Sequence, residues 1–415
     1  MKILVFSSEA WSTHSAEGLV FRKVISAMVE LDHEVTLITP RPTGLSCTHE
    51  LVVSNVIPEA MDKAIRVFSG VEKLIYVVRG ALRARRIWNR LGPFDLVVSR
   101  STPIAVHLAP AILVRAFRRR VPVLATFSDP GFINPYIKNS PALVRTTTRL
   151  IERATHRVSS LVAHTNHEVI KAYARRGVDT SKWIVFPNPF SPAQTDGVGQ
   201  ASQNSGSTRL AYVGAFYGRR QPDALFAYLR KAQEKSDFAL SIVGGVRNIY
   251  YSRDLDSRMI QVLRERALQG LREKICEFGL QDIVTILPFM EAKQLEEYIS
   301  QHVDVLVNID APTTGTDNLF LSSKIVEYLK YQKPILSFSN KGASVDFLRS
   351  VGIGRYVDYD GRDRFDLAEE PLSLIKPDRK SSMQYEASNL VQELLNRASA
   401  ARDDSRPSMT RSGKR

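Results

Sequence analysis

The stretch LFLSSKIVEYLKYQKPIL, residues 319–336, joins a helix to a buried strand and decides how the second half of the chain folds. Ser322 or Ser323 is a natural N-cap, because a hydroxyl can accept hydrogen bonds from the unpaired N–H groups at a helix start. Apolar residues recur at helical spacing over 325–329, and a turn ending in proline precedes the apolar run 335–338. The pattern predicts a helix, a turn and a strand of a parallel sheet.

Two charged residues of this helix, Lys324 and Glu327, lie three positions apart and therefore share one face near its positive end. An ordinary surface ion pair is the simplest interpretation of that spacing. A binding role becomes the better interpretation if other parts of the same domain supply complementary groups.

The chain alternates short apolar strands with helices, which is typical of doubly wound parallel sheets. In such sheets ligands bind beyond the carboxyl ends of the strands, so the strand-to-helix loops should carry the chemistry. The expected strands are 2–8, 33–40, 94–100, 121–129, 159–165 and 183–188, followed by 209–216, 238–245, 283–289, 303–310 and 333–339.

Residues 191–208 interrupt this alternation with Ser, Gly, Gln and Asn, a composition typical of a linker. We therefore predict an α/β protein with two Rossmann-like domains facing across a cleft. The first domain spans 1–190 and the second spans 209–400. Residues 401–415 are basic and polar, and we expect a disordered tail there.

Composition narrows the class of protein. The chain has 415 residues, 44% of them hydrophobic, and no apolar run long enough to cross a bilayer. The start MKILVFSSEA reads as a first strand, because it lacks the long apolar core of a signal peptide. Cys47 and Cys276 lie far apart and suggest neither a disulfide nor a zinc framework, which favours a reducing cytoplasm.

A formal charge of +14 is unusual for a metabolic enzyme. Basic residues concentrate at 79–90 and 115–120, and the first segment also contains Trp88 and apolar residues. Two interpretations stay open: arginines that only solvate the outer side of helices, and an amphipathic helix against an anionic membrane. Nucleic acid is the less favoured partner, because no recognition motif accompanies the charge.

In the first half, two loops could carry chemistry. Gly18 precedes a helix where backbone can approach a ligand, but no G-x-G-x-x-G fingerprint of a dinucleotide site is present. His14 and Glu17 could contact a substrate or simply be solvated. Asp129 follows an apolar strand directly before Pro-Gly, so it could accept a substrate hydroxyl proton or cap the turn.

In the second half, Gly214 ends a strand and Arg219 and Arg220 stand just before a helix. Arginines are electrostatically misplaced at a helix start unless an anion also binds there, and a diphosphate would resolve the conflict. Gly244 ends the next strand. Together with Ser323 and Lys324, these groups describe an anion site, and the carboxylate of Glu327 could accept hydrogen bonds from both hydroxyls of a ribose.

At this point the chain resembles a GT-B glycosyltransferase of the retaining family 4 type. The resemblance runs over most of residues 1–360, through HEVTLITP, IERATHRVSSLVAHT, KWIVFPNPF, AYVGAFYGRR, LSIVGG and, most specifically, SSKIVEYLKYQKPIL. It implies a donor nucleotide-sugar bound by the second domain and a glycan or lipid-linked acceptor bound by the first. It also implies Arg219 or Arg220 with Lys324 at the diphosphate, Glu327 at the ribose, and no obligatory metal or other cofactor.

The resemblance has one clear departure. The family commonly carries two glutamates eight residues apart, and Leu319 stands where the first would be, with Asp317 and Asn318 nearby. We expect sugar transfer with retention in the synthesis of a cell-surface polysaccharide or glycolipid, in the cytoplasm or at the inner face of the membrane. The alternatives are a GT-B nucleotide-sugar epimerase and a non-enzymatic protein that binds nucleotide or nucleic acid.

Overall fold

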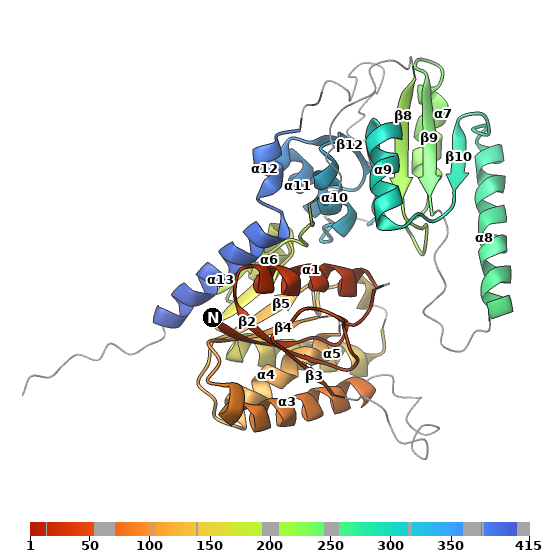
Figure 1. Cartoon of the computed structure of the whole chain (residues 1–415). Coiled ribbons are helices and arrows are strands. Elements are labelled where there is room, and N and C mark those ends of the chain that lie inside the picture. Colours follow the sequence, from red (N-terminus) through yellow and green to blue (C-terminus); the bar gives the residue numbers. More distant parts are fainter. Residues whose placement is uncertain are drawn as a thin grey trace, which may run out of the picture. The chain divides into compact units, whose positions relative to one another are not determined.

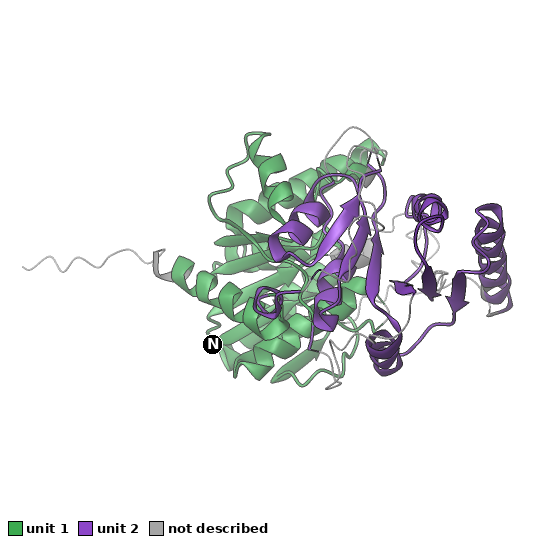
Figure 2. Ribbon diagram, turned by 90° about the horizontal axis from the view of Figure 1, so that it is seen from above, with its two compact units in different colours: residues 1–190, 385–415 green, residues 191–384 purple. Residues whose placement is uncertain are grey.

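The structure is a computed structural model, and it divides into two compact units, residues 1–190 with 385–415 and residues 191–384 (Figure 2). The residues that the structure describes are 1–13, 15–53, 71–101, 103–137, 140–192, 207–244, 257–313, 318–359, 375 and 377–404.

The first unit is built on a parallel sheet of seven strands in the order β3-β2-β1-β4-β5-β6-β7. Neighbouring strands pair in parallel; for example, Lys2 lies opposite Glu34 in the first and second strands of the chain, and Val162 lies opposite Trp183 in the last two strands of this unit. The order reverses direction between β1 and β4, which is the switch point where such sheets place ligands. The strands are β1 (Lys2–Phe6), β2 (Glu34–Thr39), β3 (His49–Val52), β4 (Leu96–Arg100), β5 (Val123–Phe127), β6 (Leu161–His164) and β7 (Trp183–Val185).

Helices cover both faces of this sheet, because its central strands are apolar on both sides (Figure 1). The faces are separated by strand alternation: Ile3 and Val5 belong to one core cluster, and Leu4 and Phe6 to the other. One face carries α1 (Ala16–Glu30) and α13 (Ala387–Asp404), and the other carries α3 (Val71–Leu91), η1 (Ile104–His107), α4 (Leu108–Arg115) and α5 (Ala142–Val158). The remaining elements are η2 (Pro135–Ile137) and α6 (His167–Ala174).

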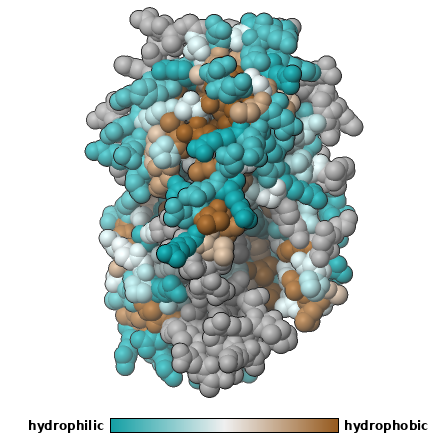
Figure 3. Space-filling model, turned by 90° about the vertical axis from the view of Figure 1, so that its right-hand side faces the viewer, coloured by the Kyte–Doolittle hydropathy of each residue, from teal (hydrophilic) through white to brown (hydrophobic). Residues whose placement is uncertain are grey.

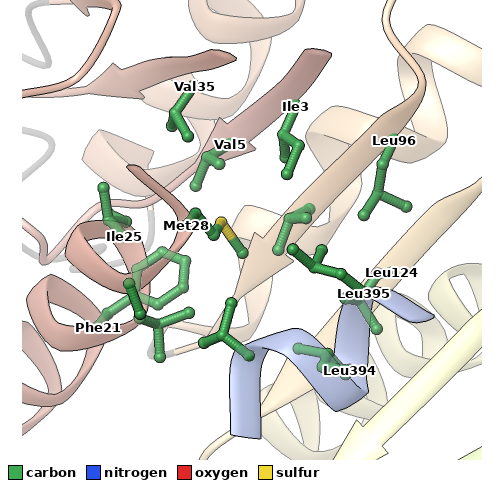
Figure 4. Close-up of a cluster of buried hydrophobic side chains, with 14 of the residues drawn as sticks. Ile3, Val5, Phe21, Ile25, Met28, Val35, Leu96, Leu124, Leu394 and Leu395 are labelled. Atoms are coloured by element: carbon green, nitrogen blue, oxygen red, sulfur yellow. The ribbon is translucent and has the colours of Figure 1, made fainter. Parts of the chain in front are cut away.

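The last helix differs from the sequence-based prediction. The predicted second domain extended to residue 400, but α13 packs in the first unit and lies against α1. Its apolar stripe is the cause: Leu394 and Leu395 reach into the cluster formed by α1 and the sheet (Figure 4). The expected linker falls largely outside the described residues, as does the tail from 405 onward, while residues 401–404 continue α13.

The second unit repeats the topology, with six parallel strands in the order β10-β9-β8-β11-β12-β13 and a switch point between β8 and β11. Its strands are β8 (Thr208–Val213), β9 (Phe238–Val243), β10 (Val284–Leu287), β11 (Val305–Ile309), β12 (Ile335–Phe338) and β13 (Gly354–Val357). Its helices are α7 (Asp223–Ala232), α8 (Ser257–Glu277), α9 (Ala292–His302), α10 (Ser323–Tyr328), η3 (Leu329–Tyr331), α11 (Ala343–Val351) and α12 (Arg379–Met383).

Each strand expected from the sequence is present, so the α/β class and the two parallel sheets are confirmed. The prediction missed β3 and β13. Both are four-residue strands at sheet edges, and each has partly exposed positions instead of a continuous apolar run. An edge strand does not need to be apolar on both faces, which removes the signal used to find the others.

The face of the molecule drawn in Figure 3 is largely hydrophilic, with hydrophobic side chains interspersed. Helix α8, which lies on the side that faces the viewer there, has exposed Met259 and Val262. Across the described part of the chain, no helix combines the length and the apolar character needed to span a membrane.

Three histidines surround Phe127 in the interior of the first unit. The ring centroids of His107, His164 and His156 lie 4.4, 4.9 and 5.8 Å from that of Phe127. Burial lowers the pKa of His107 to about 3 and that of His156 to about 4, and it lowers the pKa of His164 well below its usual range. These rings are therefore neutral in the folded protein at neutral pH.

We expect the first unit to lose stability as the pH falls from 6.5 towards 4. In this window the unfolded histidines take up protons and the folded ones do not, so each buried ring lowers the free energy of unfolding by up to about 1.4 kcal/mol per pH unit. Glu152 has the opposite effect on the free energy of unfolding, because burial raises the pKa of its carboxyl to about 7. Urea unfolding at pH 7 and pH 5 should show a smaller difference for His164→Phe than for the wild type. An equal difference in both proteins would contradict this assignment.

Candidate functional site

The second unit brings Gly214, Arg220 and Lys324 together beyond the carboxyl end of β8, next to β11, where its strand order reverses. Gly214 follows β8 directly, and its N–H donates to Val243 O at 2.9 Å. Its φ of 125° suits glycine. Gly244 follows β9 with a φ of 86° and donates to Leu287 O at 3.1 Å.

Lys324 enters this edge of the sheet from α10. Its Nζ donates to the hydroxyl of Tyr212 at 3.1 Å and lies 4.5 Å from the centre of that ring. The Tyr212 ring is in turn stacked on Phe216, with centroids 4.6 Å apart. No described carboxylate forms an ion pair with Lys324. The lysine is thus a partly buried cation held over an aromatic ring at the switch point.

Gly214 is the residue that makes room for this lysine. A Cβ at position 214 would collide with Lys324 Nζ and would lie 2.7 Å from its Cε.

Gly214→Ala should therefore displace Lys324 and also strain the backbone at positive φ, a cost of about 1–3 kcal/mol. We expect weaker nucleotide binding and a lower Tm, measured by calorimetry with and without nucleotide. Gly279→Ala is the matched control, because it shares a positive φ of 66° but has open space around it. Equal nucleotide affinities in the two variants would show that Gly214 does not shape the site.

The two predicted arginines lie on a tight hairpin before α7. The backbone N–H of Tyr217 donates to Arg220 O at 3.1 Å, and that of Arg220 donates to Tyr217 O at 2.9 Å. Arg219 is exposed at the hairpin, whereas Arg220 is half-buried over the Tyr217 ring. Burial and then the charge of Arg220 lower the pKa of Lys324 to about 7. Two cations therefore repel each other at this edge, which an anion between them would relieve.

Beneath the cations lies a buried polar network that the sequence analysis missed. Asp310, directly after β11, accepts hydrogen bonds from Ser339 Oγ at 2.9 Å and from Asn308 and Asn318 Nδ2 at 3.2 Å. Its charge opposes the lowering of the Lys324 pKa. The signal was available, because Asp310 ends the apolar strand VDVLVNID. Asn318 is committed to this network, and Asp317 lies outside the described residues.

Helix α10 differs in detail from the prediction. It is six residues long, and Ser322 occupies the N-cap position without accepting a hydrogen bond through its side chain. Ser323 is the first helical residue and is half-buried. The predicted hydroxyl cap is therefore not formed at Ser322, and the cationic groups rather than a cap define the site.

Glu327 does not pair with Lys324. Its Oε1 accepts from Lys330 Nζ at 2.9 Å, and the same lysine contacts Glu296 of α9 at 2.9 Å. The side chain of Glu327 is 31% exposed, against 6% for Glu296. A lysine thus holds Glu327 one turn beyond Lys324 and leaves part of its side chain open to solvent.

In the first unit, Gly18 allows close packing at the start of α1, and its role in ligand approach stays a prediction. It lies in the first turn of α1, where its N–H donates to the N-cap Ser15 and a Cβ would collide with the Ser12 carbonyl. Asp129 is exposed after β5, and its carboxylate accepts no hydrogen bond from the described residues. The capping interpretation of Asp129 therefore has no support in the described part of the unit.

A buried ion pair lies at the switch point of the first unit. Arg100, 2% exposed at the end of β4, donates through Nε to Glu17 at 2.7 Å and through a terminal nitrogen to Asn188 Oδ1 at 2.8 Å. Burial raises the pKa of Glu17 against the opposing effect of Arg100. Sequence reasoning named Glu17 but missed Arg100, because an arginine ending an apolar strand reads as surface. His14 lies outside the described residues.

Among the described residues, no group of three or more His, Cys, Asp or Glu side chains could hold a metal ion. Metal independence stays a prediction.

Comparisons with known proteins show which domain family and which solved structures the chain resembles. Residues 17–189 match the family model of the glycosyl transferase 4-like domain. No curated protein matches the chain in sequence. Similar solved structures include the lipopolysaccharide outer core galactosyltransferase WaaB in its apo form, with 12% identity, 96% of this chain and 99% of that chain covered, and a TM-score of 0.63.

Two further structures span nearly the whole chain. HepE of Anabaena in complex with UDP has 14% identity and a TM-score of 0.65, with 96% of this chain and 100% of that one covered. Sucrose-phosphate synthase of Thermosynechococcus elongatus has 17% identity and a TM-score of 0.62, with 95% and 97% covered.

The two parallel sheets and these neighbours define the GT-B fold. The chain has the GT-B fold, and the family 4 resemblance predicted from its motifs agrees with the glycosyl transferase 4-like domain matched over residues 17–189.

Proposed function

We propose that the protein transfers a glycosyl group from a nucleoside-diphosphate sugar to an acceptor with retention of anomeric configuration. One observation carries the proposal: Lys324 and Arg220 are neighbouring cations at the switch point of the second unit, and Lys324 has no ion-pair partner among the described residues. A diphosphate supplies the missing negative charge, and guanidinium and ammonium groups are its usual ligands.

The nucleotide that we propose first is UDP. The similar HepE structures contain UDP and UDP-glucose, which supports a uridine donor here. Arg219, Arg220 and Lys324 would bind the diphosphate, with Gly214, Gly244 and Ser323 leaving room for it. Glu327 would accept hydrogen bonds from the two ribose hydroxyls.

The proposed step is front-face displacement. The bond between the anomeric carbon and the diphosphate oxygen breaks while the acceptor oxygen attacks from the same side, and the acceptor proton passes to the leaving diphosphate. The protein contributes electrostatics, since Lys324 and Arg219 stabilise the charge that develops on the leaving group. Asp129 would position the acceptor hydroxyl, and no metal or other cofactor takes part.

The acceptor in this proposal is a glycan or a lipid-linked glycan, as in the synthesis of a cell-surface polysaccharide or glycolipid. The reaction would take place in the cytoplasm or at the inner face of the membrane.

Incubation of purified protein with donor alone separates transfer from epimerisation, because only an epimerase would release an isomeric nucleotide-sugar without an acceptor.

The ribose role of Glu327 can be tested with a matched pair of variants. Glu327→Gln should weaken UDP binding by roughly 10-fold to 100-fold, as expected for lost hydrogen bonds to a charged group. Glu296→Gln removes the other carboxylate that contacts Lys330 and should leave UDP affinity within threefold of the wild type. Isothermal calorimetry provides both values. Equal affinities in all three proteins would reduce Glu327 to a structural partner of Lys330.

A further inference from the structure

Asp310 is a buried carboxylate in the second unit that forms no ion pair with a described residue. It follows β11 directly, and only 3% of its surface is exposed. The described donors to its carboxylate are all neutral, and they come from three separate segments: Asn308 of β11, Ser339 after β12 and Asn318 ahead of α10. A neutral amide would fill the same space at a lower cost of burial, so the charge itself indicates a function.

The same network fixes the position of this carboxylate. Ser337 Oγ accepts from Asn308 Nδ2 at 2.9 Å and lies 2.7 Å from Ser339 Oγ, and both serines are fully buried. On the backbone, the carbonyl oxygen of Asp310 accepts from the Tyr359 hydroxyl at 2.6 Å. Asp310 is therefore anchored by its main chain and by its side chain, and the carboxylate is not free to swing towards another charge.

Lys324 is within electrostatic reach of Asp310 but forms no ion pair with it. Its Nζ donates instead to the Tyr212 hydroxyl at 3.1 Å. Burial and Arg220 lower the pKa of Lys324, and the charge of Asp310 opposes that change. The charge of Asp310 also adds to the effect of burial in raising the pKa of Tyr212, so the carboxylate lies near both partners of this hydrogen bond. Charges act over such gaps in a protein interior, because little water screens them.

This separation suits a lysine that must bind a ligand. A carboxylate in direct contact would occupy N–H groups of the ammonium and compete with a phosphate for them. A carboxylate held at a distance still favours the charged form of the lysine, and it leaves those N–H groups available. Asp310 thus differs from Asp304, which pairs directly with Arg209 of the same unit at 2.8 Å.

The remaining ionisable groups around Lys324 do not supply this negative charge. Arg220, on the hairpin before α7, is a cation and disfavours a second one. Glu327 of the same helix is bound by Lys330. Burial raises the pKa of the nearby phenols, which keeps them neutral at pH 8. These phenols are Tyr212, Tyr328 and Tyr359. Asp310 is therefore the described group whose charge favours protonation of Lys324.

We propose that Asp310 is a positioning residue that keeps Lys324 protonated, and so able to bind a diphosphate, without contacting the ligand itself. The inference rests on the proposed function, because it takes Lys324 to be a ligand of the donor diphosphate. It gives the buried network a role in setting the pH range over which the donor binds.

The test compares the affinity of the full-length protein for UDP at pH 6 and pH 8 by isothermal calorimetry. Asp310→Asn should raise the ratio of the two affinities about fivefold relative to the wild type, as expected when the pKa of the amine falls by about one unit. The ratio is the proper readout, because loss of the Asp310 charge also removes its repulsion of the diphosphate, and that effect is the same at both pH values.

Three further variants separate charge from packing. In a Lys324→Arg background, Asp310→Asn should leave the ratio within about twofold, because the guanidinium stays protonated throughout. Tyr359→Phe removes the hydroxyl that donates to the backbone of Asp310 but retains the carboxylate, so the Tm can fall while the ratio stays at the wild-type value. Asp310→Ser removes the same charge with a smaller side chain and should give the same rise as Asp310→Asn, which keeps the test open if the amide folds poorly.

The outcomes are distinct. An unchanged ratio in both Asp310 variants would overturn the inference, and so would a rise of equal size in the Lys324→Arg background. A rise in Tyr359→Phe would assign the effect to loosened packing instead of charge. Absence of UDP binding by the wild type at both pH values would overturn the proposed function and this inference with it, whereas UDP binding with an unchanged ratio overturns the inference alone.

Discussion

Lys324→Met should lower kcat/KM for glycosyl transfer by on the order of a hundredfold or more, because it removes a cation placed where charge develops on the leaving group. Folding should survive the change. Burial and Arg220 disfavour the charged lysine in the folded state, so its replacement by an apolar side chain of similar length removes a cost and should not lower the Tm.

The control is Lys293→Met, which makes the same substitution at an exposed position of α9 in the same unit. Initial rates and UDP affinity should match the wild type in that variant. A Lys324→Met protein with rates within threefold of the wild type would remove Lys324 from the reaction. A large fall in Tm together with the activity would point to a structural role instead.

The pH dependence follows from the lowered pKa of Lys324. Diphosphate binding needs the protonated amine, and its pKa of about 7 in the unliganded protein means that this form declines above pH 7. The affinity for UDP should fall by up to tenfold per pH unit between 7 and 9. Lys324→Arg, which stays charged throughout, should show a flatter profile in calorimetric titrations.

The second large effect concerns stability. Arg100→Leu should destabilise the first unit by about 3–5 kcal/mol, because it removes the charged donor from the largely buried Glu17 carboxylate and from the half-buried Asn188 carbonyl. For a unit of this size the Tm should fall by roughly 10 °C. Differential scanning calorimetry measures the shift directly.

The pair Arg209–Asp304 of the second unit is the comparison. Its partners are 22% and 18% exposed, so water replaces part of a lost contact, and Arg209→Leu should cost less than half as much. Combining Arg100→Leu with Glu17→Leu should restore part of the lost stability, because no buried charge then remains. A Tm within 2 °C of the wild type for Arg100→Leu alone would contradict the role given to this pair.

The sequence determined the α/β class, the central strands and the position of Gly214 at a strand end. These follow from local patterns, since a strand buried on both faces must be apolar along its length. The terminal helix was beyond such reasoning. Its stripe around Leu394 shows that it must pack, but an amphipathic pattern does not say against which domain.

The partners of charged groups were likewise decided by tertiary structure. Spacing put Lys324 and Glu327 on one face, yet Lys324 lies over Tyr212 from β8 and Glu327 is held by Lys330, which also binds Glu296 from α9. Arg100 and Glu17 are 83 residues apart and meet only because β1 and β4 are adjacent strands. The physical reason is that periodicity encodes burial along one element, whereas electrostatic partnership depends on which elements the folded sheet brings side by side.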